Sequence, residues 1–164
     1  MQLQRLVLVP FLAFALALAT GCGSKAPTGN TSSGSPGGGR PVEITANDRM
    51  IFSVSEIRAK PGEKLSVTLV NTGSMPKQAM GHNWVLLLQG TNVMDFNASA
   101  ALAASTEYIP EKFKEAVVAH TRMLGPKERD TITFDAPTIS GRHVFLCSFP
   151  GHFQVGMKGV VIVE

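Results

Sequence analysis

One short segment near the end of the chain carries three side chains that bind soft metal ions. Cys147, His152 and Met157 follow one another at five-residue intervals, and Pro150-Gly151 turns the chain between the first two. Because this segment joins two apolar runs, a single loop can direct all three side chains to one point. Cys sulfur together with imidazole suits copper or zinc, and a long, weak thioether contact is typical of copper sites that transfer electrons.

A second imidazole must come from a distant part of the chain. His82 is the candidate, because Gly81-His82-Asn83-Trp84 stands at the start of another apolar run. A single Cys, His or Met is usually a packing or surface residue, but their joint spacing favours a metal site. Four protein ligands leave no open position for a substrate, which argues against a catalytic metal site. We therefore expect no enzymatic activity.

The segments that must hold these ligands have the alternating polar and apolar pattern of β-strands. Turn signals such as Pro61-Gly62 and Asn71-Thr72-Gly73 separate them. About seven short strands of this kind predict an all-β, antiparallel sandwich. The predicted strands lie at Val42 to Thr45, Ile51 to Val54, Glu56 to Arg58, Leu65 to Val70, His82 to Leu88, Thr131 to Phe134, Gly141 to Cys147 and Gly159 to Glu164.

Residues 92 to 120 interrupt the strand pattern. Ala98 to Ala104 is rich in helix formers, and Pro110 with Glu111 behind it marks a helix start that continues to Val118. We expect a helical insertion on the flank of the β domain.

The first residues read as an export signal. In residues 1–21 a positive Arg5 precedes an apolar run and a small-residue cleavage site. The run is shorter than the roughly 20 residues of a spanning helix, so a permanent anchor helix is the weaker alternative. Ala19-Thr20-Gly21-Cys22 resembles the lipobox of bacterial lipoproteins, with Ala19 in place of the usual Leu. The resemblance implies a lipidated Cys22; a cleaved, soluble protein is the alternative.

Residues 22–40 form the predicted linker between this signal and a domain at 41–164. After Cys22 the linker consists mainly of Gly, Ser, Thr, Pro and Asn, which bury too little apolar surface to fold. A Cys22–Cys147 disulfide is the competing use of the two cysteines in an exported protein, although it would restrain little from a flexible linker. With a net charge of +3 and 16% charged residues, the chain has no polybasic surface that implies nucleic acid.

Together these motifs resemble the cupredoxins, the type 1 blue copper proteins, and their azurin/auracyanin branch most of all. The resemblance rests on Gly81 to Val85, on Cys147-x-Phe149-Pro150-Gly151-His152 and on Met157, with further likeness at Val118 to Thr121 and Asp130 to Asp135. It covers roughly Pro41 to Glu164. It implies a Greek-key β-sandwich of seven to eight strands.

The resemblance also implies a ligand set for one copper ion per chain. His82, Cys147 and His152 would be the equatorial ligands and Met157 the long axial ligand, while the Gly81 carbonyl would make a weak contact. Asn83 would tie the first ligand strand to the Cys147 loop by hydrogen bonds, and Phe149 would help to exclude water.

The function implied by the resemblance is that of a monomeric electron carrier cycling between Cu(I) and Cu(II). It would work in the periplasm or on the outer face of the cytoplasmic membrane, with c-type cytochromes or membrane electron-transfer complexes as partners. Pro150, Gly151, Phe153 and the loop of residues 75–80 would form its docking face. The alternatives are a copper storage or delivery protein and a zinc-binding structural domain.

Overall fold

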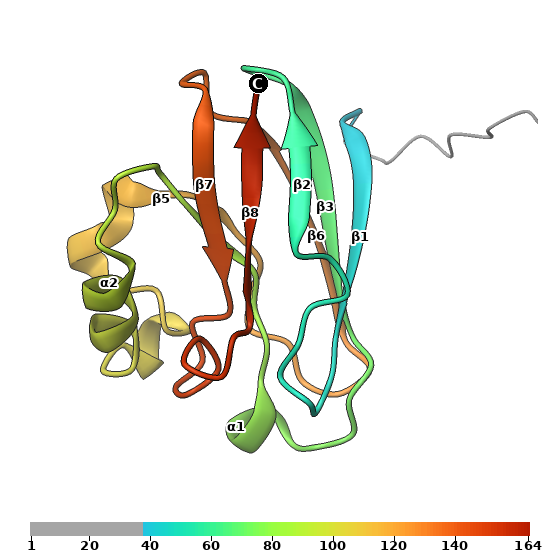
Figure 1. The fold of residues 1–164 in the computed structure, drawn as a ribbon. Helices are drawn as coiled ribbons and strands as arrows, with labels where there is room; N and C mark the ends of the chain where they lie inside the picture. Colours follow the sequence, from blue (N-terminus) through green and yellow to red (C-terminus); the bar gives the residue numbers. More distant parts are fainter. Residues whose placement is uncertain (1–37) are drawn as a thin grey trace, which may run out of the picture. The chain divides into compact units, whose positions relative to one another are not determined.

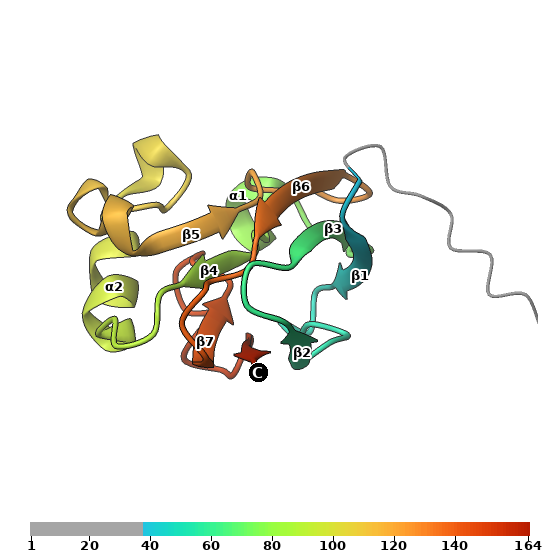
Figure 2. The same cartoon turned by 90° about the horizontal axis from the view of Figure 1, so that it is seen from above.

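Eight strands form a two-layered sandwich in residues 38–164, the part of the chain that the computed structural model describes (Figures 1 and 2). One layer is a three-stranded sheet in the order β1-β3-β6, and the other is a five-stranded sheet in the order β2-β8-β7-β4-β5. The predicted all-β sandwich is confirmed. The strands are β1 (Arg40–Ala46), β2 (Glu56–Ala59), β3 (Lys64–Asn71), β4 (Val85–Leu87), β5 (Val117–His120), β6 (Arg129–Asp135), β7 (Gly141–Leu146) and β8 (Lys158–Val163).

Two of the strand pairs are parallel, so the sandwich that was predicted as antiparallel has mixed sheets. β1 pairs with β3, and β2 pairs with β8, in parallel. The cause is that the chain crosses between layers from β1 to β2 and again from β2 to β3. Parallel neighbours need such crossovers, whereas antiparallel neighbours can be joined by a tight turn.

The core lies between the inner faces of the two sheets. On β3, Leu65, Val67 and Leu69 are fully buried, as the period of two along a strand requires. Trp84 is also fully buried and packs its ring 5.3 Å from that of Phe145, measured between centroids. The prediction that Trp84 belongs to the core is confirmed.

Two predicted strands are shorter in the structure. Residues 51–54 contribute a single bridge between Phe52 and Ala46, and the left-handed backbone of Met50 (φ 57°) marks the turn that precedes it. Of the strand predicted from His82 to Leu88, only the buried centre forms a strand, β4. On each side of β4 the chain forms loops, one of which carries His82.

The insertion is helical but begins and ends elsewhere than predicted. Helix α2 (Val93–Ala100) starts at Asn92, whose side chain accepts a hydrogen bond from the Asp95 N–H. The segment after Pro110 forms the 3₁₀ helix η2 (Glu111–Ala116), preceded by the shorter η1 (Ala104–Thr106). The prediction of a helix to Val118 was wrong because the β-branched Val117 and Val118 join β5, which pairs with β4.

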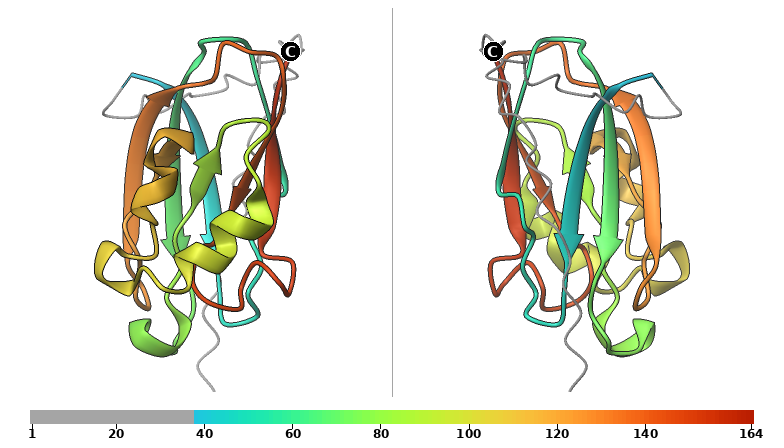
Figure 3. Two further views of the ribbon diagram at one scale, coloured as in Figure 1. Left: turned by 90° about the vertical axis from the view of Figure 1, so that its left-hand side faces the viewer. Right: turned by 90° about the vertical axis from the view of Figure 1, so that its right-hand side faces the viewer.

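The insertion covers the outer face of the five-stranded sheet over β4 and β7 (Figure 3). A second hydrophobic cluster forms there, separate from the core between the sheets. Its buried members are Val85, Leu87, Phe96, Ala100, Leu146 and Phe153.

The two ends of the sandwich differ. The short helix α1 (Lys77–Met80) and the loop between β7 and β8 lie at one end, whereas the start of β1 and the end of β8 lie at the other (Figure 1). Arg58 links those two chain ends, accepting a hydrogen bond from Arg40 and pairing with Glu164. β1 begins at Arg40, one residue inside the predicted linker. The predicted signal, Cys22 and most of the linker lie outside the described residues.

No helix of residues 38–164 has the length and hydropathy that crossing a bilayer requires.

Candidate metal centre

The structure brings together three of the predicted ligands from two distant segments. The ligand atoms of His82, Cys147 and His152 all lie within 4.8 Å of one another. The exposed fraction is 0% for His82 and Cys147 and 2% for His152. The Cys147 sulfur lies 3.3 Å from His152 Nδ1, and the two imidazole centroids are 4.9 Å apart.

Backbone hydrogen bonds close the loop that carries Cys147 and His152. Cys147 N–H donates to the Met157 carbonyl (3.1 Å), and Met157 N–H donates to the His152 carbonyl (3.0 Å). Gly151 adopts a left-handed conformation (φ 88°) that favours glycine. Met157 is fully buried. Its backbone hydrogen bonds hold the loop at Cys147 and at His152.

A two-residue bridge fixes the segment that carries His82. His82 N–H donates to the Leu124 carbonyl (3.1 Å), and Leu124 N–H donates to the His82 carbonyl (2.7 Å). A Cβ on the preceding Gly81 would lie 2.7 Å from the Lys77 carbonyl and 2.9 Å from the Met123 sulfur. The absence of a side chain at Gly81 therefore allows its carbonyl to approach Cys147, with 4.0 Å between oxygen and sulfur.

The donor atoms fit a metal ion. Both ring nitrogens of His82 are buried, and neither makes a hydrogen bond of normal geometry among the described residues, although the backbone of Asn47 is close enough to raise the pKa of this imidazole. Buried polar atoms are almost always paired. One thiolate with two imidazoles is a donor set that copper and zinc accept. A bound metal ion would give one of these two ring nitrogens a partner.

Burial sets the protonation of the metal-free site. Burial raises the pKa of the Cys147 thiol to about 12, opposed by backbone hydrogen bonds from Asn83 and Phe149. Burial, reinforced by the nearby His82, lowers the pKa of His152 to about 4. Burial also lowers the pKa of His82, against the pull of Asp48. Both imidazoles are thus neutral near neutral pH, with lone pairs available, while the thiol must lose a proton on binding metal.

Hydrogen bonds between Asn83, which follows His82, and Ser148, which follows Cys147, join the two ligand segments. Asn83 Oδ1 accepts from the Ser148 N–H (2.9 Å), and Asn83 Nδ2 donates to Ser148 Oγ (2.8 Å). Phe149 is 8% exposed and packs its ring 4.7 Å from that of His152. Asn83 therefore lies between the two ligand segments, and Phe149 lies against the His152 ring; their roles at a bound metal stay predictions.

Other predicted features lie away from this cluster. His120 is exposed, and the buried His143 hydrogen-bonds the Gln89 N–H and the Ile139 carbonyl. The prediction that Phe153 belongs to an exposed docking face was wrong. Phe153 is 7% exposed because it packs into the cluster beneath the insertion.

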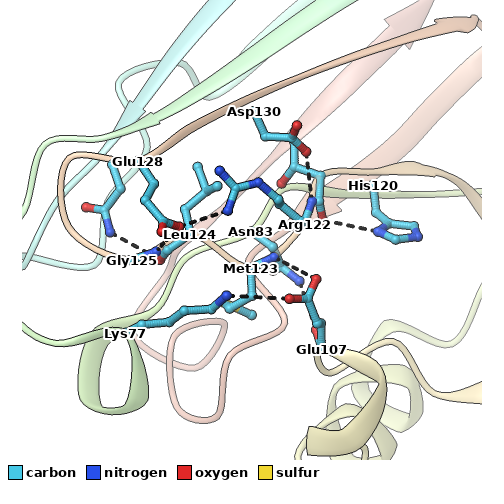
Figure 4. A network of polar contacts seen from close by, with 12 residues as sticks. Lys77, Asn83, Glu107, His120, Arg122, Met123, Leu124, Gly125, Glu128 and Asp130 are labelled. Carbon is cyan, nitrogen blue, oxygen red and sulfur yellow. Dashed lines mark hydrogen bonds and ion pairs between the residues drawn. The ribbon is translucent and has the colours of Figure 1, made fainter.

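Sequence reasoning missed the polar contacts of the insertion with the metal centre. Glu107 lies between Lys77, Asn83 and Met123 in a network beside the His82 segment (Figure 4). No motif marks Glu107, since its partners are brought to it only by the fold.

Comparisons with known proteins agree with this geometry. Residues 41–164 match the family described as copper binding proteins, plastocyanin/azurin family. Azurin-1 of Alcaligenes xylosoxydans xylosoxydans is 37% identical over 123 residues, covering 73% of this chain and 94% of that protein. Azurin of Pseudomonas fluorescens biotype A is 38% identical over 128 residues, covering 75% and 97%.

Solved structures show the same similarity. Dithionite-reduced auracyanin of Roseiflexus castenholzii superposes with a TM-score of 0.68 at 32% identity, covering 76% of this chain and 96% of that one. An azurin of Methylomonas sp. strain J gives a TM-score of 0.66 at 30% identity, covering 76% and 97%.

The β-sandwich and its buried His-Cys-His cluster define a cupredoxin, for which copper is the cofactor. The chain belongs to the plastocyanin/azurin family of copper-binding proteins.

Proposed function

We propose that this protein is an electron carrier with one type 1 copper ion, and that it is not an enzyme. The observation that carries the proposal is the buried donor set: three ligand atoms within 4.8 Å, on residues no more than 2% exposed. Copper bound there would supply a one-electron couple between Cu(I) and Cu(II). With Met157 as a fourth ligand the site would have no open position, which suits electron exchange better than substrate chemistry.

The proposed ligands are His82, Cys147 and His152 in the equatorial plane and Met157 as the axial ligand. The buried position of Met157, bonded through its backbone to Cys147 and His152, supports the axial role. The Gly81 carbonyl, 4.0 Å from the sulfur, supports the proposed weak contact.

The protein would hold the ligands in fixed positions and exclude water from the metal centre. The Asn83–Ser148 hydrogen bonds hold the two ligand segments in register, and such outer contacts orient ligands in metal sites. Phe149 covers His152 and keeps water from its ring. A site held in one geometry needs little rearrangement when its charge changes.

Partners would dock at the end of the sandwich that carries the ligand loops. Met75 (40% exposed) and Val155 (58% exposed) lie in those loops, together with the exposed Pro150 and Gly151. An apolar face of this kind suits a short-lived encounter, since redox interfaces bury less than about 1,200 Å². By family resemblance, the partners are c-type cytochromes or membrane electron-transfer complexes.

The proposed setting is the periplasm or the outer face of the cytoplasmic membrane of a bacterium. Residues 1–21 would be a lipoprotein signal, Cys22 the lipidated residue and residues 22–40 the tether of a monomeric head. From its composition alone, a Gly/Ser-rich tether of this length would reach roughly 20–25 Å. Replacing Cys22 with Ser should release the protein from membranes; unchanged membrane retention would contradict the anchor.

Absorption spectroscopy tests the carrier function. The copper-loaded, oxidised protein should show an intense visible thiolate charge-transfer band that bleaches on reduction and returns on oxidation. Cys147→Ser should lose this band while retaining the fold. A colourless copper-loaded protein would exclude the carrier and leave copper storage or delivery, which the buried ligands do not favour.

A further inference from the structure

A tight turn at the tip of the insertion carries two residues in an unusual backbone conformation. Glu107 (φ 54°) and Tyr108 (φ 63°) are both left-handed. Residues other than glycine rarely adopt this conformation and do so where surrounding contacts compensate. The contacts of these two residues therefore indicate what the turn does.

Glu107 bonds to three separate segments (Figure 4). Its carboxylate accepts a hydrogen bond from the Met123 N–H (3.0 Å) and lies 3.5 Å from Lys77 Nζ. Its backbone carbonyl accepts a hydrogen bond from Asn83 Nδ2 (3.4 Å).

Each of these partners adjoins the segment that carries His82. Met123 precedes Leu124, which bridges His82 through two backbone hydrogen bonds. Lys77 presents its carbonyl to Gly81, and Asn83 follows His82 directly. Glu107 thus contacts the His82 segment directly at Asn83 and, through Met123, the neighbouring segment that is bridged to His82.

The neighbouring Tyr108 extends these contacts to the second ligand segment. Its ring centroid lies 5.2 Å from that of Phe149, and the Phe149 ring lies 4.7 Å from that of His152. Two adjacent residues of the insertion therefore touch the surroundings of both ligand-bearing segments.

We propose that Glu107 is a positioning residue for the copper centre, and that the insertion clamps the two ligand segments together through it. This inference rests on the proposed ligand set. A recess of about 190 Å³ lies beside the clamp and is lined by Lys77, Glu107, Tyr108, Met123 and Phe149, among others. Removing the Glu107 side chain would widen this recess beside Phe149.

The hydrogen bond to Met123 carries the effect, and the ion pair adds little. Lys77 and Glu107 are 38% and 46% exposed, and exposed ion pairs contribute little to stability. Met123, in contrast, is 2% exposed, so its N–H is left unsatisfied when the carboxylate is removed. An amide oxygen at position 107 can replace the carboxylate as acceptor.

The test compares copper loss to a strong chelator in wild type, Glu107→Ala, Glu107→Gln and Glu107→Gly. The Ala and Gly variants should lose copper ~10-fold faster, at the lower end of the effect of outer contacts on metal affinity. Gln should behave as wild type. Gly relieves the left-handed strain while removing the carboxylate, so it stays informative if Ala folds poorly.

The metal-free protein gives an independent readout. Amide hydrogen exchange at Ser148, whose N–H donates to Asn83, should be faster in Glu107→Ala than in wild type. Glu111→Ala is the matched control, because Glu111 lies in the same insertion and, within residues 38–164, its one ion pair is with Lys114 at 3.6 Å. Its copper loss and Ser148 exchange should be those of wild type.

Three results would each overturn the clamp. The first is that Glu107→Ala and Glu107→Gly lose copper at the wild-type rate. The second is that Glu107→Gln loses copper as fast as Glu107→Ala, and the third is that Glu111→Ala does. Failure of the carrier function is distinguishable, since wild type itself would then show no visible charge-transfer band with copper.

Discussion

Asn83 and Ser148 hold each other by three hydrogen bonds, although 65 residues separate them in the chain. Each follows a proposed ligand, His82 in one case and Cys147 in the other. The distance between the two ligand segments is therefore set by a pair of buried polar side chains as well as by the metal.

Replacing Asn83 with Ala should weaken the copper centre. It leaves the buried Ser148 N–H and hydroxyl without partners, which costs about 2 kcal/mol of unfolding free energy, and should lower copper affinity by ~10–100-fold. Competitive chelation and urea denaturation measure the two effects. Asn92→Ala is the control: it removes the cap of α2, costs about 1 kcal/mol and should leave copper affinity unchanged. Equal copper affinity in the two variants would refute a special role for Asn83.

Gly81→Ala should damage the metal centre through lack of space. Its backbone (φ −68°) is open to any residue, but the new Cβ would meet the Lys77 carbonyl and the Met123 sulfur. We expect a shifted visible band and faster copper loss. Gly62→Ala is the opposite case, with a strained φ of 71° and open space around the Cβ. It should cost about 1 kcal/mol with an unchanged spectrum, and an unchanged spectrum in Gly81→Ala would contradict the prediction.

Stability should fall on the acid side. Hydrogen bonds from the Ser74 N–H, the Arg40 side chain and the Gly125 N–H lower the pKa values of Asp48, Glu63 and Glu128, respectively. A lowered folded-state pKa contributes stability above the unfolded value, and this contribution is lost as pH falls through the folded value.

The urea midpoint of the metal-free protein can be followed by emission of the single Trp84. It should fall as pH drops below roughly 6.5, because the lowered pKa values of the buried His82 and His152 let only the unfolded chain take up those protons. It should fall further below about pH 4, where the three carboxyl groups gain protons. In Glu128→Gln the amide gains no proton, so the decline should be smaller. The same decline in both proteins would count against a contribution from Glu128.

Substitutions at Phe153 and Val155 should have different effects, the first on stability and the second on docking. Phe153→Ala removes a ring that is 7% exposed and should cost about 3 kcal/mol of unfolding free energy. Val155→Ala changes a side chain that is 58% exposed, so stability should hold while electron exchange with a c-type cytochrome slows. Urea denaturation and stopped-flow kinetics measure these effects. A fully stable Phe153→Ala would show that the second cluster does not need this ring.

Much of the strand pattern could be predicted because one face of each sheet meets the core. Leu65, Val67 and Leu69 alternate with polar residues for that reason. The ligand loop could be predicted because His152 and Met157 follow Cys147 at fixed short spacing. In both cases the information is local in the sequence.

The remaining features depend on contacts between distant residues. Val117 and Val118 follow a helical segment but join β5 because β4 offers a partner. Phe153 follows a ligand and resembles a surface residue until α2 covers it. Glu107 meets Met123 and Asn83 across 16 and 24 residues, and no local pattern encodes such a meeting.

Arg40 and Glu164 meet at Arg58, at the end of the sandwich remote from the ligand loops. β8 alone, from Lys158 to Val163, spans roughly 20 Å between those ends. If a protein were fused, or an electrode attached, at Arg40 or Glu164, the end of the sandwich that carries the ligand loops would still face the solution. Electrons would then reach soluble carriers readily, while direct exchange with the support would have to cross the whole sandwich.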